Sequence, residues 1–339
     1  GKEVFDFVEK HHLLTALEAI LRVYNRLGRR DNKYKARIKI LVKEMGIDEF
    51  KNLVMEEWNQ IKDGPLTLTE EEITRCKNYF LEANYEVLED TPSILKSELA
   101  KNLLFNAWFE QNVSKHKKSG YSIVTICFKQ TGIAPGDITD AQLEFIADLA
   151  DKYSFGEIRV THHQNIVLAD VKQFDLPSLW QELNNKLLSV ANLGLLSDVI
   201  CCPGGDFCAL ANAKSLPIAE SIQRKFSDEG FLRDVGELRV NISGCMNACG
   251  HHHVGNIGIL GVDKKGEEFY QISLGGSSKN KASIGKIIGP AFSEQEIPEV
   301  IDKIISIYRA SRNEGETFVE TYHRIGLEPF KEYVYAKPD

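Results

Sequence analysis

The chain has 339 residues, of which 43% are apolar and 27% charged, and its formal charge at pH 7 is −8. This length and composition allow buried cores for two or three domains, while the acidic balance argues against nucleic acid as a partner. No run approaches the roughly 18 apolar residues of a membrane span, and no apolar signal segment stands near Gly1. We therefore expect a cytoplasmic protein with no membrane association.

The first 100 residues are predicted to hold helices followed by a linker. Apolar side chains recur at helical spacing through residues 1–56, so two or three amphipathic helices are expected there. Residues 57–100 are polar and irregular around Gly-Pro and Thr-Pro pairs, with one short helix expected at about residues 70–80.

From residue 121 the pattern becomes strand, helix, strand, strand, helix, which is the order of half a ferredoxin-like α+β unit. Thr139 is the expected N-cap of the first of these helices. The expected strands are 121–128, 156–160 and 165–169, and the expected helices are 140–152 and 175–188. Further along the chain we expect a helix at 211–226 and strands at 237–242, 257–262 and 268–274.

Four cysteines form two closely spaced pairs in Gly-rich turns. Cys202 and Cys208 lie in CCPGGDFC, and Cys245 and Cys249 lie in GCMNAC. Four Cys thiolates are the usual ligands of an iron–sulfur cluster, and glycine turns let backbone N–H groups point at sulfur. The two pairs therefore predict a cluster or metal site. Cys201 leaves the register ambiguous, and we choose Cys202 because it stands directly before the Pro-Gly-Gly turn.

Two other interpretations of the cysteines are disfavoured. Structural zinc usually takes C-x2-C or C-x4-C arms, which neither pair has. Disulfides need an oxidising compartment, yet the chain has seven Cys and no signal segment. Of the remaining cysteines, Cys76 is expected on a helix surface and Cys127 as a buried strand thiol.

The two cysteine segments resemble the signature of the sirohaem-dependent sulfite and nitrite reductases. A third segment, RVTHHQN at residues 159–165, resembles the R-x-T-x-x-Q-N motif that lines their sirohaem pocket. The motifs stand in the family's order, and the resemblance extends from about Leu103 to Val334. Met246 departs from the Pro that is common at this family position, which leaves the ligands intact but weakens assignment to a subfamily.

The resemblance implies two cofactors, a [4Fe-4S] cluster and a sirohaem. It implies that Cys202, Cys208, Cys245 and Cys249 bind the cluster, and that the Cys249 thiolate also bridges to the sirohaem iron as its axial ligand.

The resemblance also implies cofactor contacts in the segment before the cysteines. Gln164 is implied as a sirohaem contact and Asn165 as a residue that braces the backbone. Arg159 and Thr161 share one side of a strand by the two-residue period, and an Arg fork suits the carboxylates of a tetrapyrrole. The alternative for Arg159 is an exposed strand residue paired with a carboxylate such as Glu157 or Asp170.

The roles of the polar residues beside the last cysteine of the motif are open at this point. Asn247 can hydrogen-bond a sulfur or a sirohaem carboxylate, or it can simply be a turn residue in the left-handed conformation. His251, His252 and His253 are consecutive, so they cannot all face one ion in regular structure. We expect them to pack around the cofactor rather than to bind a metal.

A basic stripe lies in the N-terminal helical region of this acidic chain. The resemblance implies that Arg37 and Lys39 approach sirohaem carboxylates, and the ordinary alternative is a solvated helix face. The residues of the stripe are Arg29, Arg30, Lys33, Lys35, Arg37 and Lys39.

The two ends of the chain resemble each other. Residues 19–24 echo 303–308, and residues 46–54 echo 326–334, as a tandem duplication would leave them. The resemblance agrees, because these reductases are pseudo-twofold, and we expect a fragment that lacks most of its first half. The expected parts are 1–60 as the helical tail of the first repeat, 61–100 as linker, 101–193 as ferredoxin-like half domain, 194–315 as sirohaem and [4Fe-4S] domain, and 316–339 as C-terminal helical tail.

The expected fold class is α+β, a ferredoxin-like half domain followed by an α/β sirohaem and [4Fe-4S] domain. The resemblance implies an assimilatory sulfite reductase haemoprotein that takes sulfite to sulfide with six electrons from a flavoprotein or ferredoxin. Sirohaem-dependent nitrite reductase, which makes ammonia, is the alternative within the class. A [4Fe-4S] electron-transfer protein without sirohaem is the alternative of another class. In the family the anion-binding Arg and Lys residues come from the first half, so this chain alone is expected to be inactive.

Overall fold

A computed structural model describes residues 1–32 and 35–336. The chain divides into two compact units, Gly1–Tyr85 and Glu86–Asp339, and each is described by itself. Within the described residues, no helix is both long enough and apolar enough to cross a membrane.

The N-terminal unit is helical, as the spacing of its apolar residues predicts. Helices α1 and α3 pack against each other, and α2 contacts both. A small core of Ala19, Val23, Phe50 and Val54 lies between α1 and α3. The elements are η1 (Lys10–His12), α1 (Leu13–Leu27), α2 (Ile38–Met45), α3 (Ile47–Ile61), α4 (Glu70–Lys77) and η2 (Asn78–Phe80).

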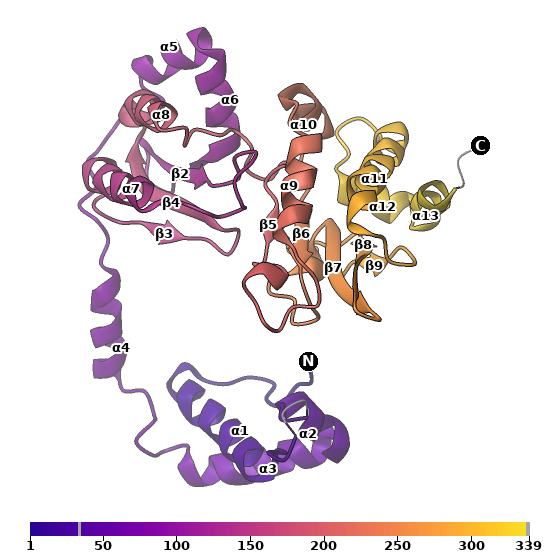
Figure 1. The fold of residues 1–339 in the computed structure, drawn as a ribbon. Helices are drawn as coiled ribbons and strands as arrows, with labels where there is room; N and C mark the ends of the chain where they lie inside the picture. The colour runs from indigo at the N-terminus through magenta and orange to yellow at the C-terminus, as the bar shows by residue number, and fades with distance from the viewer. Residues whose placement is uncertain (33–34, 337–339) are drawn as a thin grey trace. The chain divides into compact units, whose positions relative to one another are not determined.

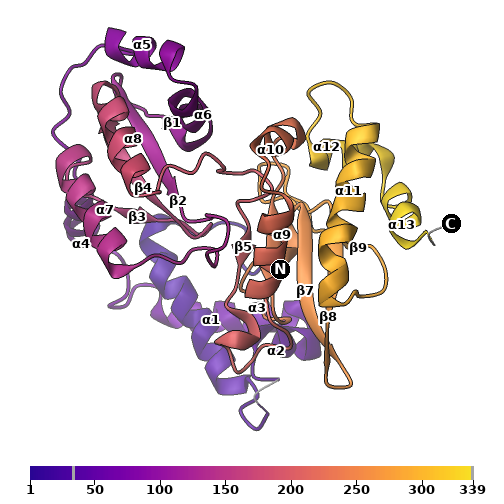
Figure 2. The same ribbon diagram turned by 45° about the horizontal axis from the view of Figure 1, so that its top comes forward.

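The first sheet of the second unit has four antiparallel strands in the order β1-β2-β4-β3; Figure 1 labels β2, β4 and β3, and Figure 2 labels β1 as well. Thr139 caps the helix after β2 with a full capping box, as expected. Helix α7 contacts β4, and α6 contacts β2. The elements are α5 (Ser93–Lys101), α6 (Leu103–Asn112), β1 (Val113–Lys115), β2 (Tyr121–Cys127), α7 (Asp140–Tyr153), β3 (Arg159–Val160), β4 (Asn165–Lys172), η3 (Gln173–Asp175) and α8 (Leu176–Asn185).

The structure has two helices, α5 and α6, that were not predicted from the sequence. Helix α5 begins within the segment that was expected to be a linker. Leu95 of α5 and Phe105 and Trp108 of α6 are fully buried in the core of the first sheet. The irregular part of the expected linker therefore ends before Ser93, and the residues after it contribute to the half-domain core.

The second sheet is mixed, with the order β5-β6-β7-β8-β9. Strands β5, β6 and β7 are parallel, and β8 and β9 are antiparallel to their neighbours. Helices α9 and α11 contact each other beside this sheet (Figures 1 and 2). The elements are β5 (Ile200–Cys201), η4 (Gly204–Asp206), α9 (Leu216–Lys225), α10 (Glu229–Val235), β6 (Val240–Ser243), η5 (His252–Val254), β7 (Ile257–Lys264), β8 (Glu267–Leu274), β9 (Lys286–Ile287), η6 (Glu294–Glu296), α11 (Ile297–Ser311), α12 (Phe318–Ile325) and α13 (Glu328–Tyr335).

Helices α11 and α12 repeat α1 and α2 in length and in turn geometry, whereas α13 has eight residues and α3 has 15. Helices α1 and α11 both have 15 residues, and α2 and α12 both have eight. Gly46 follows α2 with φ 91°, and Gly326 follows α12 with φ 80°, a left-handed conformation that favours glycine. The helix pair that packs most closely in the first unit, α1 with α3, has its counterpart in the packing of α11 with α13.

Matching tyrosines confirm the repeat. The Tyr24 hydroxyl in α1 donates to the Ala36 carbonyl at 2.8 Å, two residues before α2 begins. The Tyr308 hydroxyl in α11 donates to the Glu316 carbonyl at 3.0 Å, two residues before α12 begins. The internal echo in the sequence is therefore a repeat of structure.

Candidate functional site

The two cysteine loops leave adjacent parallel strands. Cys201 of β5 is paired with Ile242 of β6, and the N–H of Cys202 donates to the Ile242 carbonyl at 3.1 Å. The carboxyl ends of parallel strands meet at one edge of a sheet, so the loop that starts at Cys202 and the loop that starts at Gly244 begin side by side. Such an edge is where open α/β sheets usually bind ligands.

Glycines let these loops approach closely and aim a backbone donor at sulfur. The Gly244 N–H donates to Cys202 Sγ at 3.1 Å. A Cβ on Gly244 would lie 2.6 Å from the Ala213 carbonyl oxygen and 2.9 Å from Gly204 Cα, so a side chain does not fit there. Gly204 itself has φ 62°. A thiolate that accepts a backbone N–H is the environment that iron–sulfur clusters use, and the donor set of the two loops fits one.

The second cysteines of the two pairs differ in burial. Cys208 is half-buried, and its N–H donates to the Gly204 carbonyl at 2.9 Å. Cys249 is exposed, and the next residue, Gly250, returns the loop to β6 by donating to Ser243 Oγ at 3.1 Å. Among residues 1–32 and 35–336, no three His, Cys, Asp or Glu side chains are gathered closely enough to hold a metal ion.

Cys201 and Cys202 have opposite environments. Cys201 is 2% exposed within the core of the second sheet, and burial raises the pKa of its thiol well above the ordinary value. Cys202 is half-buried at the start of the loop and accepts the Gly244 N–H. A cluster ligand must be a thiolate, so these environments favour Cys202 as the ligand. Cys127 is buried in β2 and Cys76 is exposed on α4, as expected.

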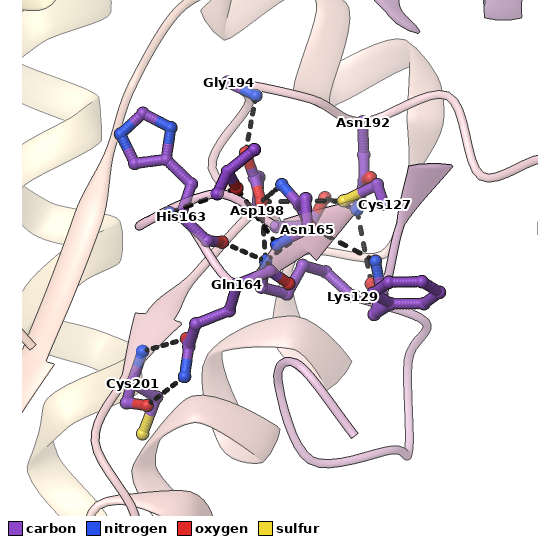
Figure 3. A network of polar contacts seen from close by, with 12 residues as sticks. Cys127, Lys129, His163, Gln164, Asn165, Asn192, Gly194, Asp198 and Cys201 are labelled. Atoms are coloured by element: carbon purple, nitrogen blue, oxygen red, sulfur yellow. Dashed lines mark hydrogen bonds and ion pairs between the residues drawn. The ribbon is translucent and has the colours of Figure 1, made fainter. Parts of the chain in front are cut away.

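The segment RVTHHQN spans β3, the turn that follows it and the first residue of β4. Figure 3 shows its last three residues, His163, Gln164 and Asn165. Thr161 Oγ1 accepts the N–H groups of His163 and Asn165 at 3.3 and 3.2 Å. Gln164 is left-handed, with φ 59°, and its side-chain amide donates to the Cys201 carbonyl at 2.8 Å and accepts the Cys201 N–H at 2.9 Å. In the structure, the Gln164 amide therefore contacts the backbone of β5. The resemblance implies that this residue contacts the sirohaem.

Asn165 and Arg159 differ in burial. Asn165 is buried and its Oδ1 accepts the Phe128 N–H at 3.2 Å, which is the bracing contact that the resemblance implies. Arg159 is exposed and forms an ion pair with Glu157, which is the ordinary alternative for this residue.

The loop around Asn247 has a different turn from the one considered in the sequence. Asn247 is exposed and does not take the left-handed conformation; Ala248 and His251 take it instead, with φ 58° and 54°. The left-handed alternative for Asn247 is therefore wrong. Its side chain is left at the exposed rim of the loop, two residues before Cys249.

The histidines lie in three environments. His251 is exposed, and His252 is 5% exposed, so burial lowers the pKa of His252 to about 4. His163 Nε2 lies 3.0 Å from Arg239 Nη1. Burial, with Arg239 as a smaller cause, lowers the pKa of His163 to about 4. The imidazoles of His163 and His252 are therefore neutral at neutral pH.

Arg239 is a residue that the sequence did not reveal. It lines a cavity of about 90 Å³ together with His162, His163, Asn241 and His251, and also an adjoining cavity of about 510 Å³ with Lys279 and Lys281. Its signal in the sequence is weak, because a single Arg before a strand has no distinctive spacing. Its position between two cavities depends on the tertiary fold.

The basic stripe lies in the N-terminal unit. Arg37 is the N-cap residue of α2 and Lys39 lies within α2, and both are exposed. Lys33 lies outside the described residues. The approach of Arg37 and Lys39 to sirohaem carboxylates stays a prediction.

We predict that acid weakens the second unit through its buried histidines. The unfolded chain gains protons on His163 and His252 below about pH 6.5, whereas the folded unit resists protonation down to about pH 4. The unfolded state then binds more protons, so the free energy of unfolding should fall as the pH drops through this window. Urea unfolding of the chain across the window should show a shallower pH dependence for His252→Leu, and an equal slope in both proteins would contradict the assignment.

Two families match this chain. The nitrite and sulphite reductase 4Fe-4S domain matches residues 1–62 and 195–338, and the nitrite/sulfite reductase ferredoxin-like half domain matches residues 115–186. The first family thus matches both ends of the chain, which are the parts that carry the helical repeat.

Curated relatives include nitrite and sulfite reductases. The ferredoxin–nitrite reductase of Synechococcus elongatus is 26% identical over 87% of this chain and 51% of that protein. The assimilatory ferredoxin-dependent nitrite reductase of Haloferax mediterranei is 31% identical over 59% of this chain and 35% of that protein. Sulfite reductase [ferredoxin] 1 of Mycolicibacterium paratuberculosis is 25% identical over 89% of this chain and 49% of that protein. The chain spans about half the length, or less, of these relatives.

Solved structures share the fold. The NirA protein of Mycobacterium tuberculosis superposes with a TM-score of 0.65 at 22% identity, over 97% of this chain and 55% of that chain. The structure of dissimilatory sulfite reductase I gives a TM-score of 0.55 at 15% identity, over 83% of this chain and 90% of that chain. The expected α+β fold, with its ferredoxin-like half domain, is confirmed. Because the 4Fe-4S domain family matches more than half of the residues, the chain belongs to the nitrite and sulphite reductase 4Fe-4S domain family.

Proposed function

We propose that this chain is the cluster-carrying part of a sirohaem-dependent reductase, and that the full-length protein reduces sulfite to sulfide. The family's cofactors are a [4Fe-4S] cluster and a sirohaem. The contact that supports the proposal best is the hydrogen bond from the Gly244 N–H to Cys202 Sγ, because it joins the two cysteine loops. When bound, the cofactors supply electron storage and the iron at which the anion is reduced.

In this proposal the chain's own residues hold the cofactors. Cys202, Cys208, Cys245 and Cys249 would hold the cluster, and Cys249, the one of the four that is exposed, would also serve the sirohaem iron. Asn247 stands on the same exposed rim and is placed to donate to a sulfur or a carboxylate.

Further contacts to the sirohaem are proposed from charge and position. Arg239 borders two cavities and offers a guanidinium to a tetrapyrrole carboxylate. The proposed contacts that await a test are Arg159, Thr161, Gln164, Asn165, Arg37 and Lys39.

Nitrite reduction is the second candidate. The relative with 31% identity and another with 26% identity are named nitrite reductases, while a relative with 25% identity is named a sulfite reductase. These three relatives have ferredoxin in their names, so we propose a ferredoxin as the electron donor, with a flavoprotein as the alternative.

We also propose that the catalytic part of the full-length protein includes a first half that covers α1. The face of α1 formed by Leu13, Leu17 and Leu21 is exposed, whereas the matching face of α11 is buried against the second sheet and its helices. A sheet layer of the kind that covers α11 would cover this face of α1. The anion-binding Arg and Lys residues would then lie in that half.

Activity and absorption of the full-length protein test this function. With a reduced viologen as donor, we expect sulfide from sulfite, and visible absorption from both sirohaem and cluster. Ammonia from nitrite without sulfide from sulfite would favour the second candidate. Cluster absorption without sirohaem bands would contradict both, and the 339-residue chain alone should form neither product.

A further inference from the structure

Lys129 is a buried ammonium group that the proposed function does not use. It follows β2 by two residues, and its side chain is 0% exposed. Lysine is among the residues least often buried fully, and desolvation makes a buried ion pair weak evidence for stability by itself. The contacts of Lys129 should therefore explain why it is buried.

The Lys129 ammonium donates hydrogen bonds to the turn that contains Gln164 (Figure 3). Its Nζ donates to the His163 carbonyl at 2.7 Å, to the Gln164 carbonyl at 3.2 Å and to Asn165 Oδ1 at 2.8 Å. Gln164 is held at φ 59°, which costs on the order of 1 kcal/mol or more for a residue with a side chain. Three contacts from one cation to consecutive residues stabilise this left-handed turn.

Gly136 also packs against Gln164. Gly136 has φ 87°, and a Cβ built there would lie 3.0 Å from Gln164 Cβ. The backbone of the 136 loop thus packs against the Gln164 side chain and limits its freedom.

The same ammonium also binds the segment that leads into β5. Lys129 Nζ lies 3.1 Å from Asp198 Oδ1, and Asp198 Oδ2 accepts the Gly194 N–H at 2.8 Å. Asp198 stands two residues before Ile200, where β5 begins. Lys129 therefore ties together the β3–β4 turn of the first sheet and the entry to β5 of the second.

Both connections end at Cys201. The Gln164 amide makes two hydrogen bonds to the Cys201 backbone, at 2.8 and 2.9 Å, so it pairs with β5 as a neighbouring strand would. Cys202 follows directly, and it accepts the Gly244 N–H from the other cysteine loop. Hydrogen bonds therefore connect Lys129 through Gln164 to the Cys201 backbone, and the peptide link from Cys201 leads on to Cys202.

We propose that Lys129 and Gln164 are positioning residues that fix the end of β5 and thereby the place of the Cys202 sulfur. Neither touches the cluster; Lys129 acts through Gln164 and Asp198, and Gln164 acts through the Cys201 backbone. The role toward the cluster rests on the proposed function, whereas the effect on the loop is a property of this chain.

Local hydrogen exchange of the cluster-free chain tests the effect on the loop. Lys129→Met removes the ammonium and keeps a side chain of similar length. Gln164→Leu removes only the hydrogen bonds to the Cys201 backbone, and Gln164 is half-buried. Gln164→Leu should therefore fold even if Lys129→Met does not. In either variant the amides of Cys202 and Gly244 should exchange about tenfold faster or more, while amides of β7 and β8 keep their rates.

Asp170→Asn is the matched control. Asp170 pairs with His116 at 3.2 Å, and both side chains are nearly as buried as the Lys129 and Asp198 pair. This variant weakens a buried polar contact in the same half domain and should leave the exchange rates of the Cys202 and Gly244 amides unchanged. Equal rates at those amides in wild type, Lys129→Met and Gln164→Leu would overturn the proposal, as would an equal acceleration in the control.

The cluster-loaded full-length protein tests the effect on the ligand. In Gln164→Leu we expect a shifted reduction potential of the cluster and broadened EPR features, while Asp170→Asn retains the wild-type values. Faster exchange with an unchanged potential and EPR spectrum would overturn the role toward the sulfur. A wild-type protein that binds no cluster would instead contradict the proposed function, and the exchange experiment would still decide whether Lys129 holds the loop.

Discussion

Replacing Cys202 by Ala should abolish the iron–sulfur cluster, whereas replacing Cys201 by Ala should leave it in place. Cys202 stands half-buried where β5 ends and accepts a backbone N–H on its sulfur, so its thiolate is available to iron. Cys201 points into an apolar core that raises its thiol pKa well above the ordinary value, which disfavours the thiolate that a ligand must be. Iron and acid-labile sulfide in the full-length protein are the measurements, with near-complete loss expected for Cys202→Ala.

The Cys201 variant is the matched control, because it changes the neighbouring residue in the same way. We expect it to lower the free energy of unfolding by about 1 kcal/mol through the small cavity it leaves, without loss of iron. A full cluster in Cys202→Ala together with loss in Cys201→Ala would show that the register is one residue off.

Local signals in the sequence explain why parts of the fold could be predicted. The helix over Asp140–Tyr153 was predictable because Thr139 and Gln142 form a capping box within four residues. Strands β6 and β7 were predicted within a few residues, whereas the two-residue strand β5 was not, and the repeat was predicted from two short echoes. In each case the pattern that indicates the element lies within the element itself.

Tertiary packing decides the parts that were missed. Helix α5 has few apolar residues, and it is held by Leu95, which is buried among residues distant in sequence. The choice of Cys202 over Cys201 rests on the Pro-Gly-Gly turn, which is a local signal, whereas the partners of Lys129 have no local signal. Lys129 and Asp198 are 69 residues apart, and no spacing rule connects a Lys after one strand to an Asp before another.

Gln164 shows the limit of resemblance as well. The resemblance implies a sirohaem contact for Gln164, and in the structure its amide binds the backbone of Cys201 in β5. The direction of its amide, toward Cys201, depends on the left-handed turn that Lys129 supports. A motif identifies such a residue, whereas its contacts follow from the three-dimensional arrangement around it.

Truncating Leu17 and Ile301 should have very different effects on the 339-residue chain. The two residues occupy matching positions of α1 and α11, but Leu17 is 48% exposed and Ile301 is 0% exposed. Ile301→Ala leaves a cavity in the core of the second sheet and should lower the local free energy of unfolding by about 2–5 kcal/mol. Leu17→Ala removes a side chain that is half in solvent, so its effect should stay within about 0.5 kcal/mol.

Hydrogen exchange resolved to peptides of α1 and α11 measures both effects in one experiment, because the two helices belong to separate compact units. The same pair also tests the proposed first half. In the full-length protein a sheet layer over α1 would bury Leu17, and Leu17→Ala should then become as costly as Ile301→Ala. If Leu17→Ala lowers the local free energy of unfolding by an equally small amount in the short chain and in the full-length protein, no sheet layer covers the exposed face of α1. The repeat would then include the helices but not their packing against a sheet.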